Sequence, residues 1–294
     1  MKILGVGIVT MDIINQVTSY PDEDDEVRAV SQRISRGGNV ANTLSALRYL
    51  GYACAWAGNL ASDQASSFVE RDLQKRDIDC SHVCRLKHGS LPVSYITSSQ
   101  ENGSRTIVHY RDLPEYDAKP FMSVDPTEYD WIHFEGRNVE ALQIMMQHLL
   151  ENNYQNFSLE VEKPRKDIES LFKFPAVLMF SRAYVAQTHN SIKDFFAALR
   201  TDGVRAGLYC GWGKSGAWAM TDSGDLIQQP AWQPEQVKDT LGAGDVFNAG
   251  IIAATLGQLS CAEALEFACH YSGFKCGIEG FDGLSLFRKQ HESN

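Results

Sequence analysis

The sequence predicts an α/β protein in which helices cover both faces of a mostly parallel sheet. Two observations support this prediction. Apolar runs typical of buried strands alternate with helical patterns, and the composition is that of a globular protein, with 44% hydrophobic and 22% charged residues. This composition excludes disorder as the main state. The 294 residues would fill two average domains or one large one. We expect one domain, over 1–294, with a small lid.

Six apolar runs have the length and composition of buried strands. They are Ile3–Val9, Cys54–Ala57, Trp131–Phe134, Phe157–Val161, Ala176–Phe180 and Val204–Tyr209. Helical patterns lie between them, and three of these have recognisable ends. The pattern Val40–Leu50 is followed by Gly51, which suits a helix stop. Asn138 can cap a second helix, and Ser260 with Glu263 forms a capping box for a third.

Two segments break the alternation and are predicted as exposed strands, Glu26–Ser35 and Leu91–Tyr110. The second contains Asn102-Gly103, a strong signal for a tight hairpin turn. We expect these strands to form a small sheet that stands off the main domain as a lid, built from about residues 12–36 and 91–112.

The charge and the cysteines restrict the classes of partner and compartment. A net charge of −10 argues against nucleic acid or an anionic membrane as the main partner, because both favour a basic face. No transmembrane or secretory segment is visible, since Asp12 interrupts the short apolar run at the start. The seven cysteines are scattered, which suits reduced thiols and a cytoplasmic location.

The strongest local motif is DTLGAGD, Asp239–Asp245, followed by the helical run Val246–Leu256. Small residues at a helix start let the backbone N–H groups approach an anion, and the helix dipole also favours negative charge there. Asp245 would lie beside that anion as a base, an arrangement that suits a kinase. The alternative is a glycine-rich helix cap with an N-terminal acid, and such caps are common.

A second motif, RGGNVAN at 36–42, opens the Val40–Leu50 helix. Asn39 and Asn42 are three residues apart, so they share one face of the first turn, and their amides suit a ligand with several hydroxyls. The alternative is that Asn39 merely caps the helix while Asn42 is exposed. Asp12 follows the first strand, where α/β folds place ligands, but alone it is more simply a loop acid.

Charged residues mark further candidate positions around the same site. Arg105 follows the hairpin turn and could reach a phosphate from the lid, although arginines beside hairpins are usually solvated. The strings Glu135–Asn138 and Glu160–Arg165 both follow predicted strands and suggest the rim of an active site. Structural ion pairs would give the same pattern.

Two other patterns do not support a site. Gly213-Lys214-Ser215 looks like the end of a P-loop, but that motif needs glycine where Leu208 stands. Cys80 and Cys84 would be ~13 Å apart in an extended segment at about 3.3 Å per residue. Thiolates that share a zinc ion lie within ~4 Å of each other, so these cysteines are expected to be packing residues.

Through DTLGAGD, RGGNVAN and the two-part lid, the sequence resembles the ribokinase (PfkB) family of sugar kinases. Its ketohexokinase branch is similar in four strings: HFEGRN at 133–138, EVEKPR at 160–165, GSRTI at 103–107 and KCGIEGFDG at 275–283. The resemblance runs from about residue 3 to residue 284. It implies a ribokinase-like three-layer αβα domain with a β-sheet lid.

The activity implied by the resemblance is ATP-dependent phosphorylation of D-fructose at the 1-hydroxyl, giving fructose 1-phosphate and ADP. Other family substrates stay open: the fructose 6-hydroxyl, ribose, another ketose or a nucleoside. A non-catalytic regulator that binds a sugar or nucleotide is the alternative from a different class. The intact GAGD element argues against it, because a pure binder has no use for a base.

The resemblance also implies roles for the residues that match the family motifs. The expected anion hole and base are Gly242, Ala243, Gly244 and Asp245. The expected sugar contacts are Asp12, Gly38, Asn39 and Asn42. The expected ATP contacts are Arg105, Gly211, Gly213, Gly216, Cys276 and Gly277.

One departure from the family concerns the metal. Many members have an Asn-x-x-Glu motif that organises the magnesium hydration shell, but Ser181–Tyr184 stands here instead. The metal ligands are therefore unassigned, with Glu160 or Glu162 as candidates acting through water. The implied cofactors are ATP and Mg²⁺, with K⁺ as a further candidate. The implied partners are the sugar and ATP, with a homodimer formed through the lid.

Overall fold

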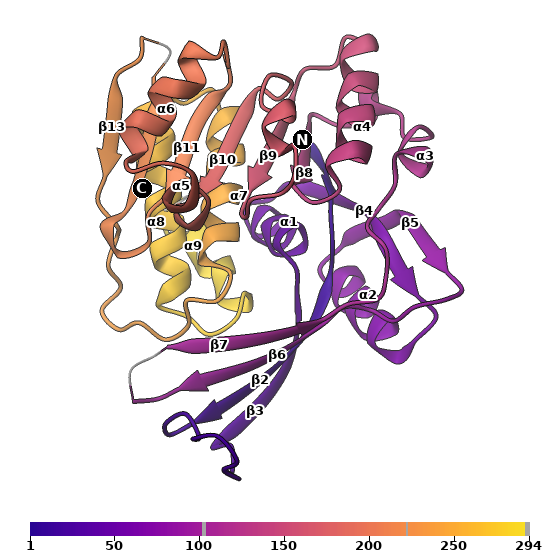
Figure 1. Ribbon diagram of the computed structural model, residues 1–294, viewed down its shortest axis with the longest axis vertical. Helices are drawn as coiled ribbons and strands as arrows, with labels where there is room; N and C mark the ends of the chain where they lie inside the picture. Colours follow the sequence, from indigo (N-terminus) through magenta and orange to yellow (C-terminus); the bar gives the residue numbers. More distant parts are fainter. Residues whose placement is uncertain (102–103, 222, 292–294) are drawn as a thin grey trace.

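The computed structural model describes residues 1–101, 104–221 and 223–291, which form two sheets of unequal size (Figure 1). Within these ranges the larger sheet has the strand order β13-β12-β11-β10-β9-β8-β1-β4-β5. The strands are β1 (Lys2–Val6), β4 (Ala53–Ala61), β5 (Ile78–Leu86), β8 (Trp131–Glu135), β9 (Phe157–Val161), β10 (Val177–Ser181), β11 (Gly207–Gly211), β12 (Ala217–Met220) and β13 (Leu226–Gln229). Neighbours are parallel, except that β12 is antiparallel to both β11 and β13.

Helices cover both faces of this sheet, as predicted. Successive strand residues face opposite layers, so Ile3 of β1 packs into one apolar cluster and Leu4 into the other. The first layer contains α1 (Asn39–Tyr49), α2 (Gln64–Lys75), α7 (Ala243–Leu256), α8 (Cys261–Cys276) and α9 (Ser285–His291). The second contains α3 (Ala118–Phe121), α4 (Val139–Glu151), α5 (Arg182–Thr188) and α6 (Ile192–Thr201). The three-layer αβα prediction is confirmed.

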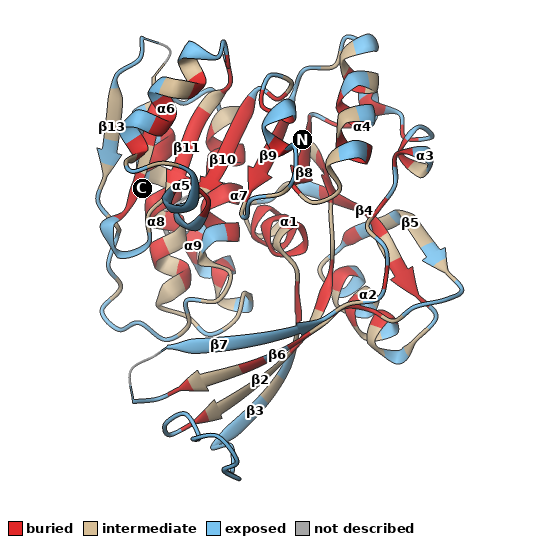
Figure 2. Cartoon of the chain, in the orientation of Figure 1, coloured by how far each residue is buried: buried red, intermediate tan, exposed pale blue. Residues whose placement is uncertain are grey.

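The smaller sheet, called the lid below, is built from the two segments in which exposed strands are predicted. Its order is β3-β2-β6-β7, from β2 (Thr10–Val17), β3 (Ser31–Gly37), β6 (Val93–Ser99) and β7 (Arg105–Tyr110). The central pair β2–β6 is parallel and the outer pairs are antiparallel. The lid projects from one end of the large sheet (Figure 1), and its strands are far more exposed than those of the large sheet (Figure 2). The Asn102-Gly103 turn lies outside the described residues.

Some predicted boundaries are wrong, for identifiable reasons. The first strand ends at Val6, not Val9, because the chain leaves the large sheet at Gly7 and starts lid strand β2 at Thr10. Residues 26–30 are not part of β3, which begins at Ser31. They begin at the end of the acidic run Asp22–Glu26, which offers no apolar face to bury.

The predicted helix ends are confirmed. Ser260 and Glu263 form a capping box at α8, and the Asn138 side chain accepts from Ala141 N at the start of α4. Gly51, with φ of 96°, follows the end of α1. No helix among the described residues is both long and apolar enough to span a membrane.

Candidate active site

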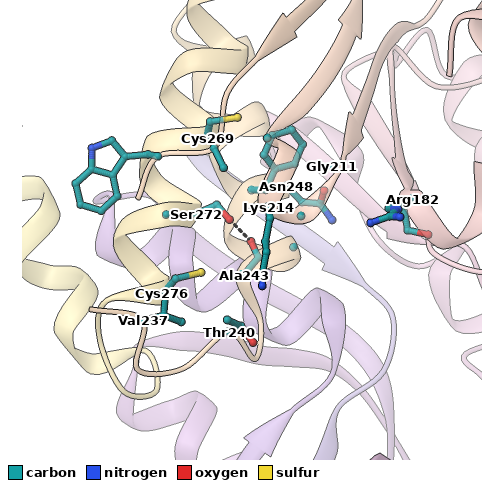
Figure 3. Close-up of a pocket in the computed structure, with 18 of the residues that line it drawn as sticks. Arg182, Gly211, Lys214, Val237, Thr240, Ala243, Asn248, Cys269, Ser272 and Cys276 are labelled. Atoms are coloured by element: carbon teal, nitrogen blue, oxygen red, sulfur yellow. Dashed lines mark hydrogen bonds between the residues drawn. The ribbon is translucent and has the colours of Figure 1, made fainter. Parts of the chain in front are cut away.

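A cavity of about 690 Å³ lies beside the N-terminus of α7 (Figure 3). Its walls come from α7, α8, the ends of β10 and β11, and the segment 231–237. The sequence-predicted residues that line it are Arg105, Gly211, Gly213, Gly216, Ala243, Gly244 and Cys276. Gly277 stands behind this wall, since a Cβ there would lie 2.9 Å from Cβ of Pro234, a lining residue. A volume of this size suits a small-molecule ligand.

The N-terminus of α7 faces this cavity with its polar backbone groups. Gly242 is the N-cap, with φ of 79°, and a Cβ there would lie 2.5 Å from the Phe281 ring. The Ser272 hydroxyl donates to the Ala243 carbonyl at 2.7 Å, which fixes the first turn (Figure 3). First-turn N–H groups lack intrahelical acceptors. The Ala243 N–H donates to the Thr240 carbonyl at 3.3 Å, whereas Gly244, which lines the cavity, can offer its N–H to an anion.

A buried ion pair holds the turn that precedes this helix. The side chain of Lys275 is completely buried. Its Nζ donates to the Asp239 carbonyl at 2.9 Å and lies 3.4 Å from Asp239 Oδ2. Asp239 also accepts from the N–H groups of Leu241 and Gly280. Although burial opposes it, the charge of Lys275 helps to lower the pKa of Asp239. The turn is thereby fixed relative to α8.

Asp245 is buried in the first turn of α7, with 8% of its surface exposed. Its Oδ2 accepts from Asn42 Nδ2 at 2.8 Å. Burial raises its pKa well above the usual range, and the nearby carboxylates of Glu162 and Glu135 act in the same direction. A carboxylate held in this way is a stronger proton acceptor than an exposed one. As in the alternative of a glycine-rich cap, Gly242 is the N-cap and Asp245 is an acid of the first turn, but Asp245 is also buried against Asn42.

The two asparagines of the RGGNVAN motif point toward acids from other elements. Asn42 is buried against Asp245, and Asn39 Nδ2 lies 3.1 Å from Glu160 Oε1 and 3.2 Å from Glu162 Oε2. Gly38, not Asn39, is the N-cap of α1, and no side chain caps that helix. The expectation that Asn39 caps and Asn42 is exposed is wrong.

Asp12 is not a loop acid. It lies within β2 of the lid, buried, where Thr10 Oγ1 donates to its Oδ1 at 2.8 Å. Burial raises its pKa, which hydrogen bonds from Thr10 and Ser94 counteract. Arg105 stands at the start of β7, and its Nη1 donates to Thr240 Oγ1 at 2.8 Å. Arg105 therefore connects the lid to the turn before α7, whereas the hydrogen bonds of Asp12 lie within the lid.

The charged strings at the strand ends divide into two kinds. Arg137 pairs with Glu135 at 3.0 Å and with Glu115 at 2.8 Å. The first string, Glu135–Asn138, therefore contains the structural ion pairs that were the alternative to a site. In the second string, Glu160 lines the cavity and its buried Oε2 has no hydrogen-bond partner. No group of three or more potential metal ligands from His, Cys, Asp and Glu occurs within the described ranges.

Sequence reasoning missed three cationic residues at the site. Arg182 and Lys214 line the cavity (Figure 3), and Arg36 is buried behind Asn42. Arg182 belongs to the stretch that departs from the family motif, and Lys214 to the rejected P-loop resemblance. Their positions just after β10 and β11 could have identified the first two, because parallel strands end at a common edge.

Comparisons with known proteins identify the family of this chain. Mouse ketohexokinase is 41% identical over 295 residues, covering 96% of this chain and 98% of that protein. A putative ribokinase from Agrobacterium tumefaciens superposes with a TM-score of 0.82 at 18% identity, over 100% of this chain and 98% of the other. Arabidopsis thaliana ribokinase, solved with ribose and ATP, gives 0.77 at 15% identity, over 98% of both chains. The model of the pfkB family carbohydrate kinases matches residues 1–282, and the chain belongs to that family.

Proposed function

We propose that this sugar kinase transfers the γ-phosphoryl group of ATP to the 1-hydroxyl of D-fructose, giving fructose 1-phosphate and ADP. The observation that carries the proposal is the buried Asp245 in the first turn of α7, which accepts from Asn42 Nδ2 and directly follows the cavity-lining Ala243 and Gly244. The substrate is inferred from the 41% identity to mouse ketohexokinase.

The contacts support a different role for each group of site residues. Asp12, Gly38, Asn39 and Asn42 would hold the sugar hydroxyls. Asp245 would accept the proton of the attacking hydroxyl as its oxygen bonds to the γ-phosphorus and the bond to the ADP oxygen breaks. The N–H groups of Gly242, Ala243 and Gly244, with Arg105, would stabilise the transferred phosphoryl oxygens. Arg182 and Lys214 add positive charge around the triphosphate.

Fructose specificity is tested by ADP release with Mg-ATP in the presence of D-fructose, D-ribose, D-tagatose, adenosine or no sugar. We expect fructose to give the highest kcat/KM and phosphorus NMR to identify the 1-phosphate. Turnover that prefers another sugar would keep the kinase and replace the substrate. ATP binding without turnover on any sugar would favour a regulator instead.

The residues around Glu160 fit a magnesium ion. Its Oε2 is buried without a partner, and the Asn39 amide that lies between Glu160 and Glu162 brings the two carboxylates close together. Mg²⁺ prefers oxygen ligands and usually binds through one or two carboxylates, waters and substrate phosphates. When bound, the ion would neutralise negative charge on the phosphates. We propose that Glu160 and Glu162 hold it, directly or through water.

Substituting glutamine for Glu160 is expected to raise the Mg²⁺ concentration needed for half-maximal activity by about 10–100-fold. The neutral amide cannot replace the unpartnered carboxylate oxygen. Activity is titrated with Mg²⁺ at saturating sugar. Glu169→Gln is the control, since Glu169 accepts a hydrogen bond from the Tyr184 hydroxyl and does not line the cavity. Superimposable titration curves for Glu160→Gln and the wild type would rule out Glu160 as a magnesium ligand.

We also propose a homodimer formed through the lid. Paired residues on all four lid strands place Ile34, Ile13, Tyr95 and Val108 in one row on the face opposite Asp12. Ile34, Tyr95 and Val108 are 48%, 49% and 65% exposed, which is unusual for apolar side chains in one row. Light scattering should give twice the chain mass of 32.8 kDa.

A further inference from the structure

Arg36 is buried next to Asn42, the residue that donates a hydrogen bond to the proposed base Asp245. Its side chain is 2% exposed, and all three of its guanidinium nitrogens donate hydrogen bonds. Nη1 donates to Asn42 Oδ1 at 2.9 Å, Nη2 to Ser45 Oγ at 2.8 Å and Nε to Asp72 Oδ2 at 2.8 Å. We propose that Arg36 is a positioning residue for phosphoryl transfer, because it fixes the amide of Asn42 that holds Asp245.

The direction of each hydrogen bond explains why an arginine is needed. A guanidinium can only donate, so it selects the oxygen of the Asn42 amide. The amide nitrogen must then face Asp245, to which it donates at 2.8 Å. If the amide turned over, its oxygen would face the carboxylate and its nitrogen would face the cation. Arg36 therefore holds Asn42 as a donor toward the base even before the sugar arrives.

Arg36 is itself anchored by an ion-pair chain that runs to the surface. Asp72 on α2 also accepts from Arg76 Nε at 3.1 Å, and Arg76 Nη1 donates to Asp282 Oδ1 at 2.6 Å. The ring of Phe281, next to Asp282, lies 6.0 Å from the Arg36 guanidinium and covers Gly242. Residues from α2 and the segment 281–282 thus hold the guanidinium of Arg36, on β3, against Asn42 and Ser45 of α1.

The surrounding charges make the expected pH effect specific. The groups that act on Asp245 from other elements are the carboxylates of Glu162 and Glu135, the Asn42 amide and the cation Arg36. The charge of Asp245 in turn raises the pKa of Glu160. The groups around Arg36 are Asp72, Arg76 and Asp12. The charge of Arg36 favours ionised Asp245, whereas the nearby acids oppose its ionisation. Loss of the cation should therefore raise the pH below which activity falls, the acidic limb of the pH profile.

The test uses the full chain, with kinetics in two backgrounds. Arg36→Lys keeps the charge but not the three-pronged donor, and we expect kcat to fall by about 10–100-fold. In an Asn42→Ala background the same substitution should have little further effect, since Arg36 acts through Asn42. Arg36→Met, which also removes the charge, should move the acidic limb of kcat/KM up by about 0.5–1 pH unit. Arg36→Lys should leave that limb in place.

Arg48→Lys is the matched control. Arg48 also donates three hydrogen bonds, to Arg76 O, Tyr52 O and Asp77; it contacts the backbone of Arg76 and not the side chain that bonds Asp72, so its kcat should be unchanged. Equal losses for Arg36→Lys in both backgrounds, or wild-type kcat, would overturn the proposal. If Arg36→Met does not fold, the comparison of Arg36→Lys in the wild-type and Asn42→Ala backgrounds still tests the proposal.

The inference rests on Asp245 as the base, which is tested separately. An Asp245→Asn variant that keeps more than about a tenth of wild-type kcat would remove the base. An inactive Asp245→Asn with normal Arg36→Lys kinetics would overturn only the role of Arg36.

Discussion

Replacing Asp245 by asparagine is expected to lower kcat by a factor of about 10²–10⁴, because the amide cannot accept the hydroxyl proton. The side chain keeps its size, and its oxygen can still accept from Asn42 Nδ2. Sugar and ATP binding should therefore change little. Single-turnover kinetics with saturating Mg-ATP and fructose measure the loss in the chemical step.

The stability of the same variant should move in the opposite direction. Burial raises the pKa of Asp245, so the folded protein holds this proton at pH values where the unfolded chain has lost it. Near pH 7 folding therefore carries the cost of burying the charge or retaining the proton, and asparagine removes that cost. We expect the free energy of unfolding near pH 7 to stay the same or rise, and the gain to disappear in acid, where both states are protonated.

Asp63→Asn is the matched control for Asp245→Asn. Asp63 also stands at a helix N-terminus, as the N-cap of α2, but it accepts from Ser66 N and Leu91 N and its pKa is lowered. Its replacement should leave kcat unchanged and lower stability slightly. A thermal melt and a rate for each variant separate the two roles. An Asp245→Asn protein that loses stability like the control while keeping most of its activity would mean that Asp245 is structural.

The sequence could predict those parts of the site that local chemistry dictates. The glycines before α7 and α1, the helices they open, and the lid strands follow from short stretches of chain. The partners of those motifs do not: Asn42 and Asp245 are 203 positions apart, and Arg36 and Asp72 are 36 apart. Only the packing of α1 against α7 and of α2 against the lid brings these side chains together.

The hairpin strands β12 and β13 show a second limit of prediction. They are only four residues each, and the apolar runs of the sequence predict no strand there. Their antiparallel pairing extends the sheet beyond the alternating strand–helix pattern. Lys214 lies in the connection between β11 and β12, so its place at the cavity depends on pairing that no local pattern predicts.

Replacing Gly38 by alanine is the second change with a large expected effect. Gly38 has φ of 100°, a left-handed conformation that costs a side-chain-bearing residue about 1–3 kcal/mol. A Cβ there would also lie 2.5 Å from the Ile8 carbonyl oxygen and 2.8 Å from Val9 Cα. Both are backbone atoms, so no side-chain rotation can relieve the overlap. We expect the free energy of unfolding to fall by about 2–5 kcal/mol.

The activity of Gly38→Ala should fall further than its stability requires. Relief of the overlap must move either the first turn of α1, which carries Asn39 and Asn42, or the segment that leads from Ile8 to Asp12. Ile8 N is itself held by Glu135 Oε2 at 3.0 Å, so the strain is shared with the acids behind the site. Displacements of about 1 Å in a reacting geometry cost roughly 10²-fold. We expect such a loss in kcat/KM for fructose, measured at a temperature where the variant is fully folded.

Gly203→Ala separates backbone strain from the loss of space. Gly203 has a similar φ of 83°, but a Cβ there would meet no atom within 4 Å. It should therefore lose about 1–2 kcal/mol and keep wild-type kcat/KM. The difference in unfolding free energy between the two variants, from chemical denaturation, is the cost of the contact with Ile8 and Val9. Equal stabilities and equal kinetics for both would mean that the segment after β1 yields freely, and that Gly38 does not position the sugar contacts.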